Sequence, residues 1–265
     1  MREPRVGVGR TAEVLAWEDN RVLKLFYEGF PWQVAEEEAR TTERLHELGL
    51  PVPRVDGVIE EAARPGIVFE RIDGPSMLFR LTRFPWPVTR LARVLADLHG
   101  SVHRHRMPEL PSLRDALERR IREAPRLSAE EKRATRDALG ELPNDSVVCH
   151  GDFHPDNVLL SRRGPIVIDW TDVHQGHPSA DVAKTVLLLR LGEPPEGTRG
   201  RWLIDLLRRR FQRAYLLRYR GTRSVSETAL QAWLLPVAAA RLADGIPQER
   251  KKLVGMVRSG LAEAR

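Results

Sequence analysis

The chain has 265 residues and a mass of 30.2 kDa, with 42% hydrophobic and 30% charged residues. These values are ordinary for a globular protein and exclude a collagenous, disordered or membrane-spanning chain. The formal net charge of +6 would suit an anionic partner, but no nucleic-acid-binding motif accompanies it, so we expect neither a nucleic acid nor a membrane as partner. The single cysteine, Cys149, excludes an internal disulfide, and the N-terminus lacks the apolar run of a secretory signal, so we expect a cytoplasmic protein.

The first 74 residues are predicted to form strands around one helix. Residues 31–48 are rich in Glu, Arg and Ala on a helical apolar period, and Gly49 follows as a stop. Residues 5–28 have the composition of strands, and the turn-like triplet at 18–20 predicts a hairpin there. The apolar runs expected to form strands are 12–17 and 21–26 before the helix, and 55–59 and 67–72 after it.

Beyond residue 74 the pattern becomes mainly helical, with one further hairpin. A short apolar run at 147–149 precedes a polar loop, and apolar runs at 158–160 and 166–168 flank a turn that contains Gly-Pro. We therefore expect an α+β fold with two lobes: a small β-rich N-lobe, residues 1–74, and a larger, mainly helical C-lobe, residues 75–265. The expected helices are 88–105, 112–124, 129–141 and most of the chain from 180 onward.

The polar loop at residues 150–157, His-Gly-Asp-Phe-His-Pro-Asp-Asn, carries the most informative group of side chains. Asp169 follows Asn157 by 12 positions, at the end of the next apolar run. Phosphoryl transfer needs such a set, because one carboxylate orients the attacking hydroxyl while an Asn and an Asp hold Mg²⁺ against the phosphates. Asp152 is therefore the candidate catalytic residue, and Asn157 and Asp169 are the candidate metal ligands.

These residues resemble a known family. His-Gly-Asp-x-x-x-x-Asn followed by Ile-Asp-Trp is similar to the motifs of the aminoglycoside phosphotransferase and choline kinase-like superfamily, whose members are related to the protein kinases. Gly151 stands where the protein-kinase loop has Arg, and Trp170-Thr171 stand where it has Phe-Gly. The resemblance implies a protein-kinase-like fold in which ATP lies between the two lobes.

The resemblance places a glycine turn over the phosphates at the start of the chain. Gly7, Gly9 and Thr11 lie in the matching segment, where glycines would let backbone N–H groups approach phosphate oxygens. Ala12 stands where the protein-kinase pattern has its third glycine. Taken alone, the segment is equally well explained as an ordinary turn.

Lys24 is the lysine that the resemblance assigns to the phosphates. It lies in an apolar strand, where an unpaired ammonium is costly, so we expect it to bind phosphate and a glutamate. The alternative is a lysine on an edge strand that faces water. The family pattern selects Glu38 of the following helix as its partner, with Glu37 as the second choice.

Two further segments match the family. Residues 67–74 are similar to the hinge between the lobes, where the carbonyl of Glu70 and the N–H of Ile72 would bind adenine through the main chain. Residues 176–183 resemble a Gly-x-Pro-x-x-Asp segment, in which Asp181 would cap a helix and brace the catalytic loop.

Several neighbouring residues allow two interpretations. His99 and His103 lie four positions apart on one helix, but no third metal ligand is apparent, which favours a packed polar face. Asp172 would either assist Mg²⁺ or be a polar neighbour of the site, and His174 would either touch substrate or lie outside it. Cys149, in an apolar strand, is expected to be inert core.

The resemblance implies a small-molecule kinase that transfers the γ-phosphate of ATP to a hydroxyl, with Mg²⁺ as cofactor, acting as a monomer or homodimer. A protein kinase is disfavoured because only 12 positions separate Asp169 from Asp181, which leaves no room for a long activation segment. A nucleotide-binding pseudoenzyme that acts through a partner remains the alternative, although no member of the expected catalytic set is missing.

The sequence says less about the substrate that would accept the phosphate. After Asp181 the chain has 17 basic and seven acidic residues, which disfavours a pocket for a polycation such as an aminoglycoside. Residues 199–223 hold nine arginines and one acidic residue, and form either a solvated helix face or an anchor for an acidic substrate. Four aromatic residues would line a pocket there or belong to the core: Trp202, Tyr215, Tyr219 and Trp233.

Overall fold

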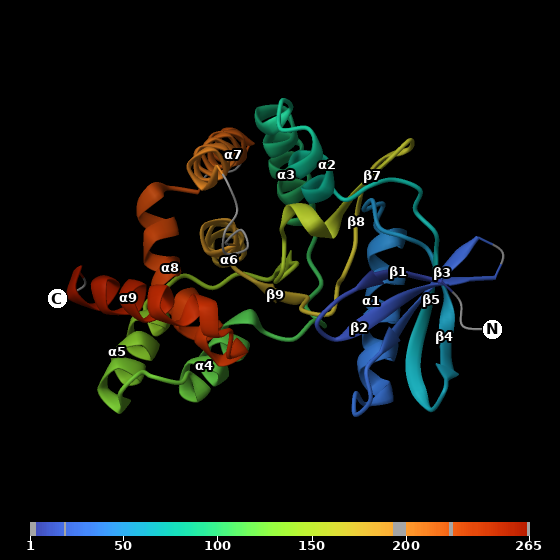
Figure 1. Ribbon diagram of the computed structural model, residues 1–265. Coiled ribbons are helices and arrows are strands. Elements are labelled where there is room, and N and C mark those ends of the chain that lie inside the picture. Colours follow the sequence, from blue (N-terminus) through green and yellow to red (C-terminus); the bar gives the residue numbers. More distant parts are fainter. Residues whose placement is uncertain (1–3, 19, 193–199, 223–224, 264–265) are drawn as a thin grey trace. The chain divides into compact units, whose positions relative to one another are not determined.

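Figure 1 shows the computed structural model, which describes residues 4–18, 20–192, 200–222 and 225–263. The chain divides into two compact units: Met1–Arg80 with Pro155–Thr171, and Leu81–His154 with Asp172–Arg265. The first unit is built on an antiparallel sheet and the second is mainly helical, so the predicted α+β class is confirmed. The assignment of nucleotide binding to 1–74 and of the substrate site to 75–265 remains a prediction.

A five-stranded antiparallel sheet in the order β1-β2-β3-β5-β4 forms most of the first unit. Helix α1, Trp32–Glu47, lies alongside it (Figure 1). The predicted hairpin is confirmed, and the last predicted strand ends at Glu70 rather than Ile72 because the chain turns away into the Asp-Gly-Pro segment. The strands are β1 (Arg5–Val8), β2 (Ala12–Trp17), β3 (Arg21–Phe26), β4 (Val55–Glu61) and β5 (Arg64–Glu70).

Alternation along β3 decides which way Lys24 points. Leu23 and Leu25 pack with Val68 in one buried cluster, whereas Phe26 packs in a second cluster that includes residues of α1. Because side chains alternate along a strand, Lys24 shares the face of Phe26 and is directed to the α1 side of the sheet. The residues that α1 buries are Ala35, Glu38, Ala39, Thr42 and Leu45, a helical stripe that includes one glutamate.

The predicted second hairpin belongs to the same unit. Strands β7, Val158–Ser161, and β8, Gly164–Val167, pair with Val158 opposite Val167. A short 3₁₀ helix, Pro155–Asn157, leads into β7, and the N–H of Ile168 donates to the carbonyl of Asn157 at 3.0 Å. Asn157 and Asp169 therefore lie at the same end of the hairpin.

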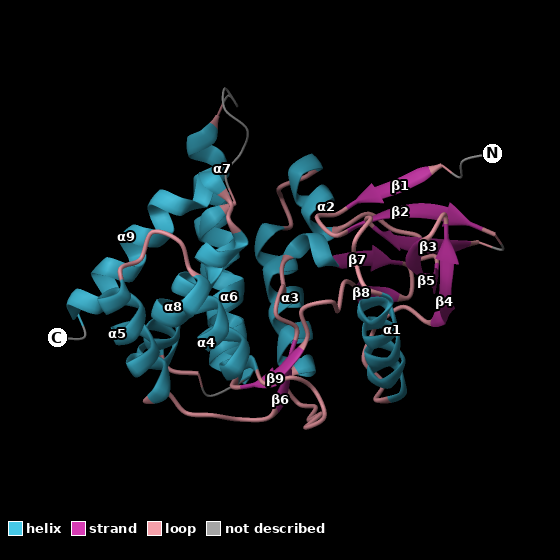
Figure 2. Ribbon diagram, turned by 90° about the horizontal axis from the view of Figure 1, so that it is seen from below, coloured by secondary structure: helices cyan, strands magenta, loops and turns pink. Residues whose placement is uncertain are grey.

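The second unit is a group of helices with a short ladder between β6 and β9 (Figure 2). The predicted helices are confirmed to within a few residues at each end, while α2 and β9 are short and lack the periodicity that would predict them. Within the described ranges, no helix combines the length and apolar character needed to cross a membrane. The remaining elements are α2 (Met77–Arg83), α3 (Val88–Val102), α4 (Leu113–Glu123), α5 (Ala129–Gly140), β6 (Val147–Cys149), β9 (His174–Gly176), α6 (Pro178–Leu191), α7 (Arg201–Thr222), α8 (Glu227–Arg241), the 3₁₀ turn Leu242–Asp244 and α9 (Pro247–Glu263).

Candidate active site

Lys24 lies at the centre of a compact ionic cluster in the first unit. Its Nζ is 2.8 Å from both carboxylate oxygens of Glu38 and 2.8 Å from Oδ1 of Asp169. The side chains of Lys24 and Glu38 are only 11% and 2% exposed. Burial lowers the pKa of Lys24, but the two carboxylates outweigh it, so its pKa lies above the ordinary value and the ammonium is charged at neutral pH.

The structure selects Glu38 from the acidic residues of α1. Glu38 lies in the buried stripe of the helix, whereas Glu36, Glu37 and Glu43 are exposed. A helix turns by about 100° per residue, so its neighbour Glu37 points away from the sheet. The pairing expected from the family pattern is therefore present, and the alternative partner does not reach Lys24.

Asp169 and Asn157 offer oxygen atoms at one end of the β7–β8 hairpin. Asp169, two positions after the end of β8, has φ of 65°, a left-handed conformation that aspartate adopts more readily than most residues. Its side chain is 41% exposed, while Asn157 is buried. A carboxylate and a carboxamide at one hairpin end are hard oxygen donors, which fit Mg²⁺ or another hard divalent cation.

The turn between β1 and β2 is held by backbone hydrogen bonds. The N–H of Gly9 donates to the carbonyl of Ala12 at 2.8 Å, and the N–H of Tyr27 donates to the carbonyl of Thr11 at 2.9 Å. Gly7 pairs with Val14 across the turn. Ala12, which stands where the protein-kinase pattern has its third glycine, begins β2 and packs in the core cluster that includes residues of α1.

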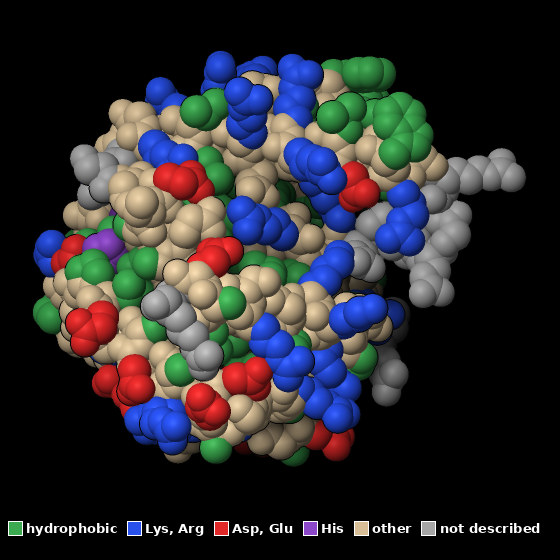
Figure 3. Space-filling view, turned by 90° about the vertical axis from the view of Figure 1, so that its left-hand side faces the viewer, with side chains coloured by type: hydrophobic (Ala, Val, Ile, Leu, Met, Phe, Trp, Pro, Cys, Tyr) green, Lys and Arg blue, Asp and Glu red, His purple; other side chains and the backbone are tan. Residues whose placement is uncertain are grey.

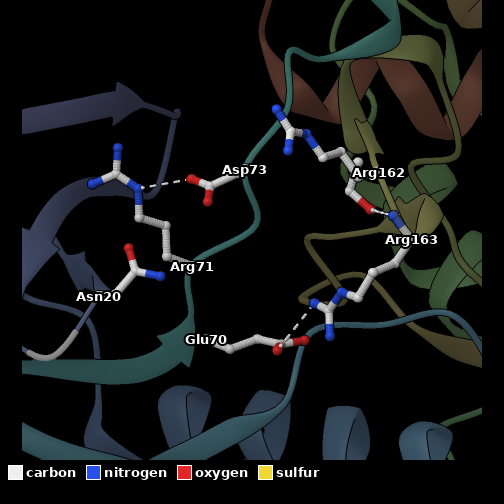
Figure 4. Close-up of a pocket in the computed structure, with 7 residues that line it drawn as sticks. Asn20, Glu70, Arg71, Asp73, Arg162 and Arg163 are labelled. Atoms are coloured by element: carbon white, nitrogen blue, oxygen red, sulfur yellow. Dashed lines mark hydrogen bonds and ion pairs between the residues drawn. The ribbon is translucent and has the colours of Figure 1, made fainter.

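The expected hinge borders a cavity of about 670 Å³ in the first unit (Figure 4). Glu70 directs its carboxylate to Arg163 at 3.1 Å and Arg71 pairs with Asp73 at 3.4 Å, so two ion pairs occupy its wall. The side chain of Glu70 is therefore engaged in an ion pair, and the adenine contact expected of its carbonyl remains a prediction. The cavity is lined by Asn20, Glu70, Arg71, Asp73, Ser161, Arg162 and Arg163, without Ile72 or the Lys24 cluster.

Asp152 belongs to the second unit, in the loop after β6. Its Oδ2 lies 3.3 Å from Nε2 of His154, and its backbone N–H donates to Nδ1 of His150 at 3.2 Å. Burial raises the pKa of Asp152, but the hydrogen bond and charge of His154 and the charge of Lys184 outweigh it, so the pKa lies below the ordinary aspartate value. Asp152 is therefore an ionised carboxylate at neutral pH.

Asp181 braces the loop that carries Asp152. Its carboxylate, fully buried, accepts hydrogen bonds from the backbone N–H groups of His150 at 2.6 Å and of Gly151 at 3.0 Å. The expectation that Asp181 also caps a helix is wrong, because the N-cap of α6 is His177, whose side chain accepts from the N–H of Ser179. Asp181 lies one turn inside that helix.

His99 and His103 meet the same carboxylate. Their Nε2 atoms lie 3.0 Å and 3.2 Å from Oδ2 of Asp181, a third side chain with a possible ligand atom that was not apparent from the sequence. Their Nδ1 atoms each lie 2.6 Å from a tyrosine hydroxyl, of Tyr215 and Tyr219. All four ring nitrogens are therefore engaged in hydrogen bonds, which supports a packed polar cluster; sequence reasoning missed it because its members are far apart in the chain.

The structure also shows the surroundings of the remaining candidates. Asp172 pairs with Lys184 at 3.2 Å, and Nδ1 of His174 lies 2.7 Å from the carbonyl of Asp172. Cys149 is fully buried, and burial raises the pKa of its thiol well above the ordinary value, as expected for an inert core residue. Tyr215, Tyr219 and Trp233 are core residues, whereas Trp202 is 72% exposed.

The arginine-rich segment lies largely on α7. Arg218 pairs with Asp97, Arg220 with Glu227, and Arg210 donates to the hydroxyl of Thr89. Arg199 and Arg223, at its two ends, lie outside the described residues. On the face seen in Figure 3, basic side chains are spread out with acidic ones between them, as in a solvated surface.

Residues 5–228 match the sequence profile of the phosphotransferase enzyme family. The chain belongs to this family. The match includes every candidate residue from Gly7 to Asp181, and the family resemblance predicted from the His-Gly-Asp loop is confirmed.

Known proteins with similar sequence or structure agree with this family. An aminoglycoside 3'-phosphotransferase from Streptomyces fradiae is 32% identical over 182 residues, 60% of this chain and 66% of that protein, so the match spans just under two thirds of the relative. An aminoglycoside 3'-phosphotransferase of type VIII has a TM-score of 0.61 at 24% identity, covering 91% of this chain and 90% of that one. An amicoumacin kinase in complex with AMP-PNP, Ca²⁺ and Ami has a TM-score of 0.66 at 12% identity, covering 99% and 88%. These two structures share the fold of this chain.

Proposed function

We propose that this protein is an ATP-dependent kinase that transfers the γ-phosphate to a hydroxyl group of a small molecule. The observation that carries the proposal is the cluster in which the Lys24 ammonium is held by Glu38 and Asp169. A charged lysine held on a rigid sheet beside a carboxylate that can bind a metal suits the binding of nucleotide phosphates. Membership of the phosphotransferase enzyme family supports the same chemistry.

In this proposal the first unit binds the nucleotide. Lys24, oriented by Glu38, contacts the α and β phosphates, and the backbone of the β1–β2 turn covers them at Gly7, Gly9 and Thr11. The adenine edge would hydrogen-bond to the carbonyl of Glu70 and the N–H of Ile72. The nucleotide in the related amicoumacin kinase structure supports this use of the fold.

Asn157 and Asp169 would hold Mg²⁺. Their oxygen atoms suit a hard divalent cation, and the Ca²⁺ in the amicoumacin kinase complex is such an ion. Bound there, the ion would neutralise phosphate charge during transfer. Asp152, ionised at neutral pH, would accept a hydrogen bond from the substrate hydroxyl and orient it toward the γ-phosphate.

An aminoglycoside is the first acceptor to test, because the curated relative is named for one. The excess of basic over acidic residues after Asp181 weighs against a polycation, so neutral and acidic hydroxyl compounds belong in the same panel. We further propose that the protein acts in the cytoplasm as a monomer or homodimer, without nucleic acid or membrane as partner.

The test is ADP release coupled to acceptor phosphorylation, with Mg·ATP and a panel of aminoglycosides, macrolides, choline, sugars, amino acids and nucleosides. Stimulation by one class, lost in Asp152→Asn, is the expected result. Because a general base or orienting carboxylate contributes about 10²- to 10⁴-fold, the loss is expected in kcat, with nucleotide binding retained. Absence of Mg·ATP binding to the wild-type protein would contradict the proposal.

A further inference from the structure

Thr171 lies within the Lys24 cluster, two positions after Asp169. Its Oγ1 is 2.9 Å from Nζ of Lys24, 2.8 Å from Oε2 of Glu38 and 2.9 Å from Oδ1 of Asp169. One hydroxyl thus contacts all three charged groups proposed to bind the nucleotide and its metal. The protein-kinase pattern has glycine at this position, which carries no such group.

The donors and acceptors around the Thr171 hydroxyl limit the hydrogen bonds that it can form. The Lys24 ammonium only donates hydrogen bonds and the two carboxylates only accept them, whereas a threonine hydroxyl accepts and also donates its single hydrogen. Thr171 therefore accepts from Lys24 and donates to either Glu38 or Asp169. Its hydrogen can be donated to either of two carboxylates that share one ammonium and repel each other.

We infer that Thr171 is a positioning residue that links the Lys24–Glu38 ion pair to Asp169, so that divalent cation binding at Asp169 and phosphate binding at Lys24 support each other. The inference rests on the proposed function. When the oxygens of Asp169 turn to a cation, the hydrogen of Thr171 is left for Glu38, which keeps Glu38 directed at Lys24. Without a cation, the same hydrogen can hold Asp169 against Lys24.

The burial of Lys24 and Glu38 makes this single hydroxyl important. Lys24 and Glu38 are almost entirely withdrawn from water, so solvent cannot readily replace a lost hydrogen bond between them. A valine at position 171 would have nearly the same shape but would place a methyl group against three charged side chains. A serine would keep the hydroxyl and lose only the methyl group.

The experiment measures binding of ADP by isothermal titration calorimetry, with and without Mg²⁺, to the full chain, and needs no acceptor. Thr171→Val is expected to weaken Mg·ADP binding about tenfold or more, the size expected for a hydrogen bond to a charged group, and to reduce the ratio of affinities with and without Mg²⁺. Thr171→Ser is expected to stay within about threefold of wild type. Thr135→Val, which removes a buried hydroxyl bonded to the Glu131 carbonyl at 2.7 Å in the second unit, is the control and should bind normally.

The outcomes separate this inference from the proposed function. A wild-type protein that binds no Mg·ADP overturns the proposed function, whatever the variants do. If the wild-type protein binds Mg·ADP and Thr171→Val has the same affinity and the same ratio of affinities with and without Mg²⁺, only the inference is overturned. The inference is also overturned if Thr171→Ser binds Mg·ADP as weakly as Thr171→Val. Melting temperatures check folding, and if Thr171→Val is unfolded, Thr171→Ala takes its place in the same comparison.

Discussion

The backbone N–H of His150 donates a 2.6 Å hydrogen bond to the carboxylate of Asp181, 31 positions later in the sequence. The next N–H, of Gly151, donates to the other oxygen of the same carboxylate. Burial raises the pKa of Asp181, but interactions with His99 and His103 outweigh it and keep the pKa well below the ordinary value. A buried, ionised side chain thus fixes the two residues that precede Asp152.

Replacing Asp181 with Asn should loosen this loop. The carboxamide has one acceptor oxygen and brings N–H donors toward groups that are themselves donors, so buried hydrogen bonds are lost. We expect Asp181→Asn to lower the free energy of unfolding by about 3 kcal/mol and to speed amide exchange at residues 150 and 151. Urea unfolding and hydrogen exchange by mass spectrometry measure both effects, with the partly exposed Asp145→Asn as control. Unchanged exchange at 150–151 would show that Asp181 does not hold the loop.

Gly151 is required by backbone geometry. Its φ is +79°, and a Cβ at this position would collide with the carbonyl of Asp172. Gly151→Ala should therefore destabilise the protein by about 1–3 kcal/mol and reduce activity by displacing Asp152. Gly140→Ala, in a helix where a Cβ meets open space, is the matched control and should be neutral or slightly stabilising. Equal melting temperatures for the two variants would refute this explanation.

Variants of Glu38 and Glu37 test which glutamate is the partner of Lys24. Glu38→Gln removes the charge that compensates Lys24 in a buried site, so we expect weaker Mg·ATP binding and a loss of about 1–3 kcal/mol of stability. Glu37→Gln changes an exposed side chain and should leave both unchanged. Nucleotide titration and thermal unfolding of both variants make the comparison, and an equal effect of the two would disprove the assigned pairing.

The burial of His99 predicts that the free energy of unfolding depends on pH. Burial, with the charge of His103, lowers its pKa to about 3, whereas an unfolded histidine titrates near 6.5. Between these values the unfolded chain binds a proton that the folded chain excludes, so stability is lost as pH falls from about 6.5 toward 3. One such histidine contributes a slope of up to about 1.4 kcal/mol per pH unit.

Urea unfolding at pH 7, 6 and 5 measures that slope. The His99→Gln variant, which cannot take up a proton, should show a shallower dependence than wild type even if it is less stable throughout. Replacing exposed His46 with Gln should leave the slope unchanged. An identical slope in wild type and His99→Gln would mean that other groups carry the acid sensitivity.

Much of this molecule follows from local sequence pattern. The apolar run of residues 21–26 predicts the strand that carries Lys24, and the long apolar period of residues 88–105 predicts α3, whereas the face on which Lys24 lies came from the packing of the sheet. The short elements α2 and β9 could not be predicted, because seven and three residues are too few to show a period. β9 exists because it pairs with β6, a contact between distant parts of the chain.

The candidate site likewise has some features that follow from the sequence and others that only the tertiary structure shows. The sequence by itself determined the family, the polar loop that carries Asp152 and the strand that carries Lys24, because spacing within a loop or strand is local and residue types indicate chemistry. Only the tertiary structure decided that Glu38 rather than Glu37 meets Lys24, that Thr171 joins the same cluster, and that Asp181 holds the loop with two histidines. Lys24 and Glu38 are 14 positions apart, and Thr171 lies 133 positions from Glu38 and 147 from Lys24. Residues so far apart in sequence come into contact only when helix faces and strand ends pack together.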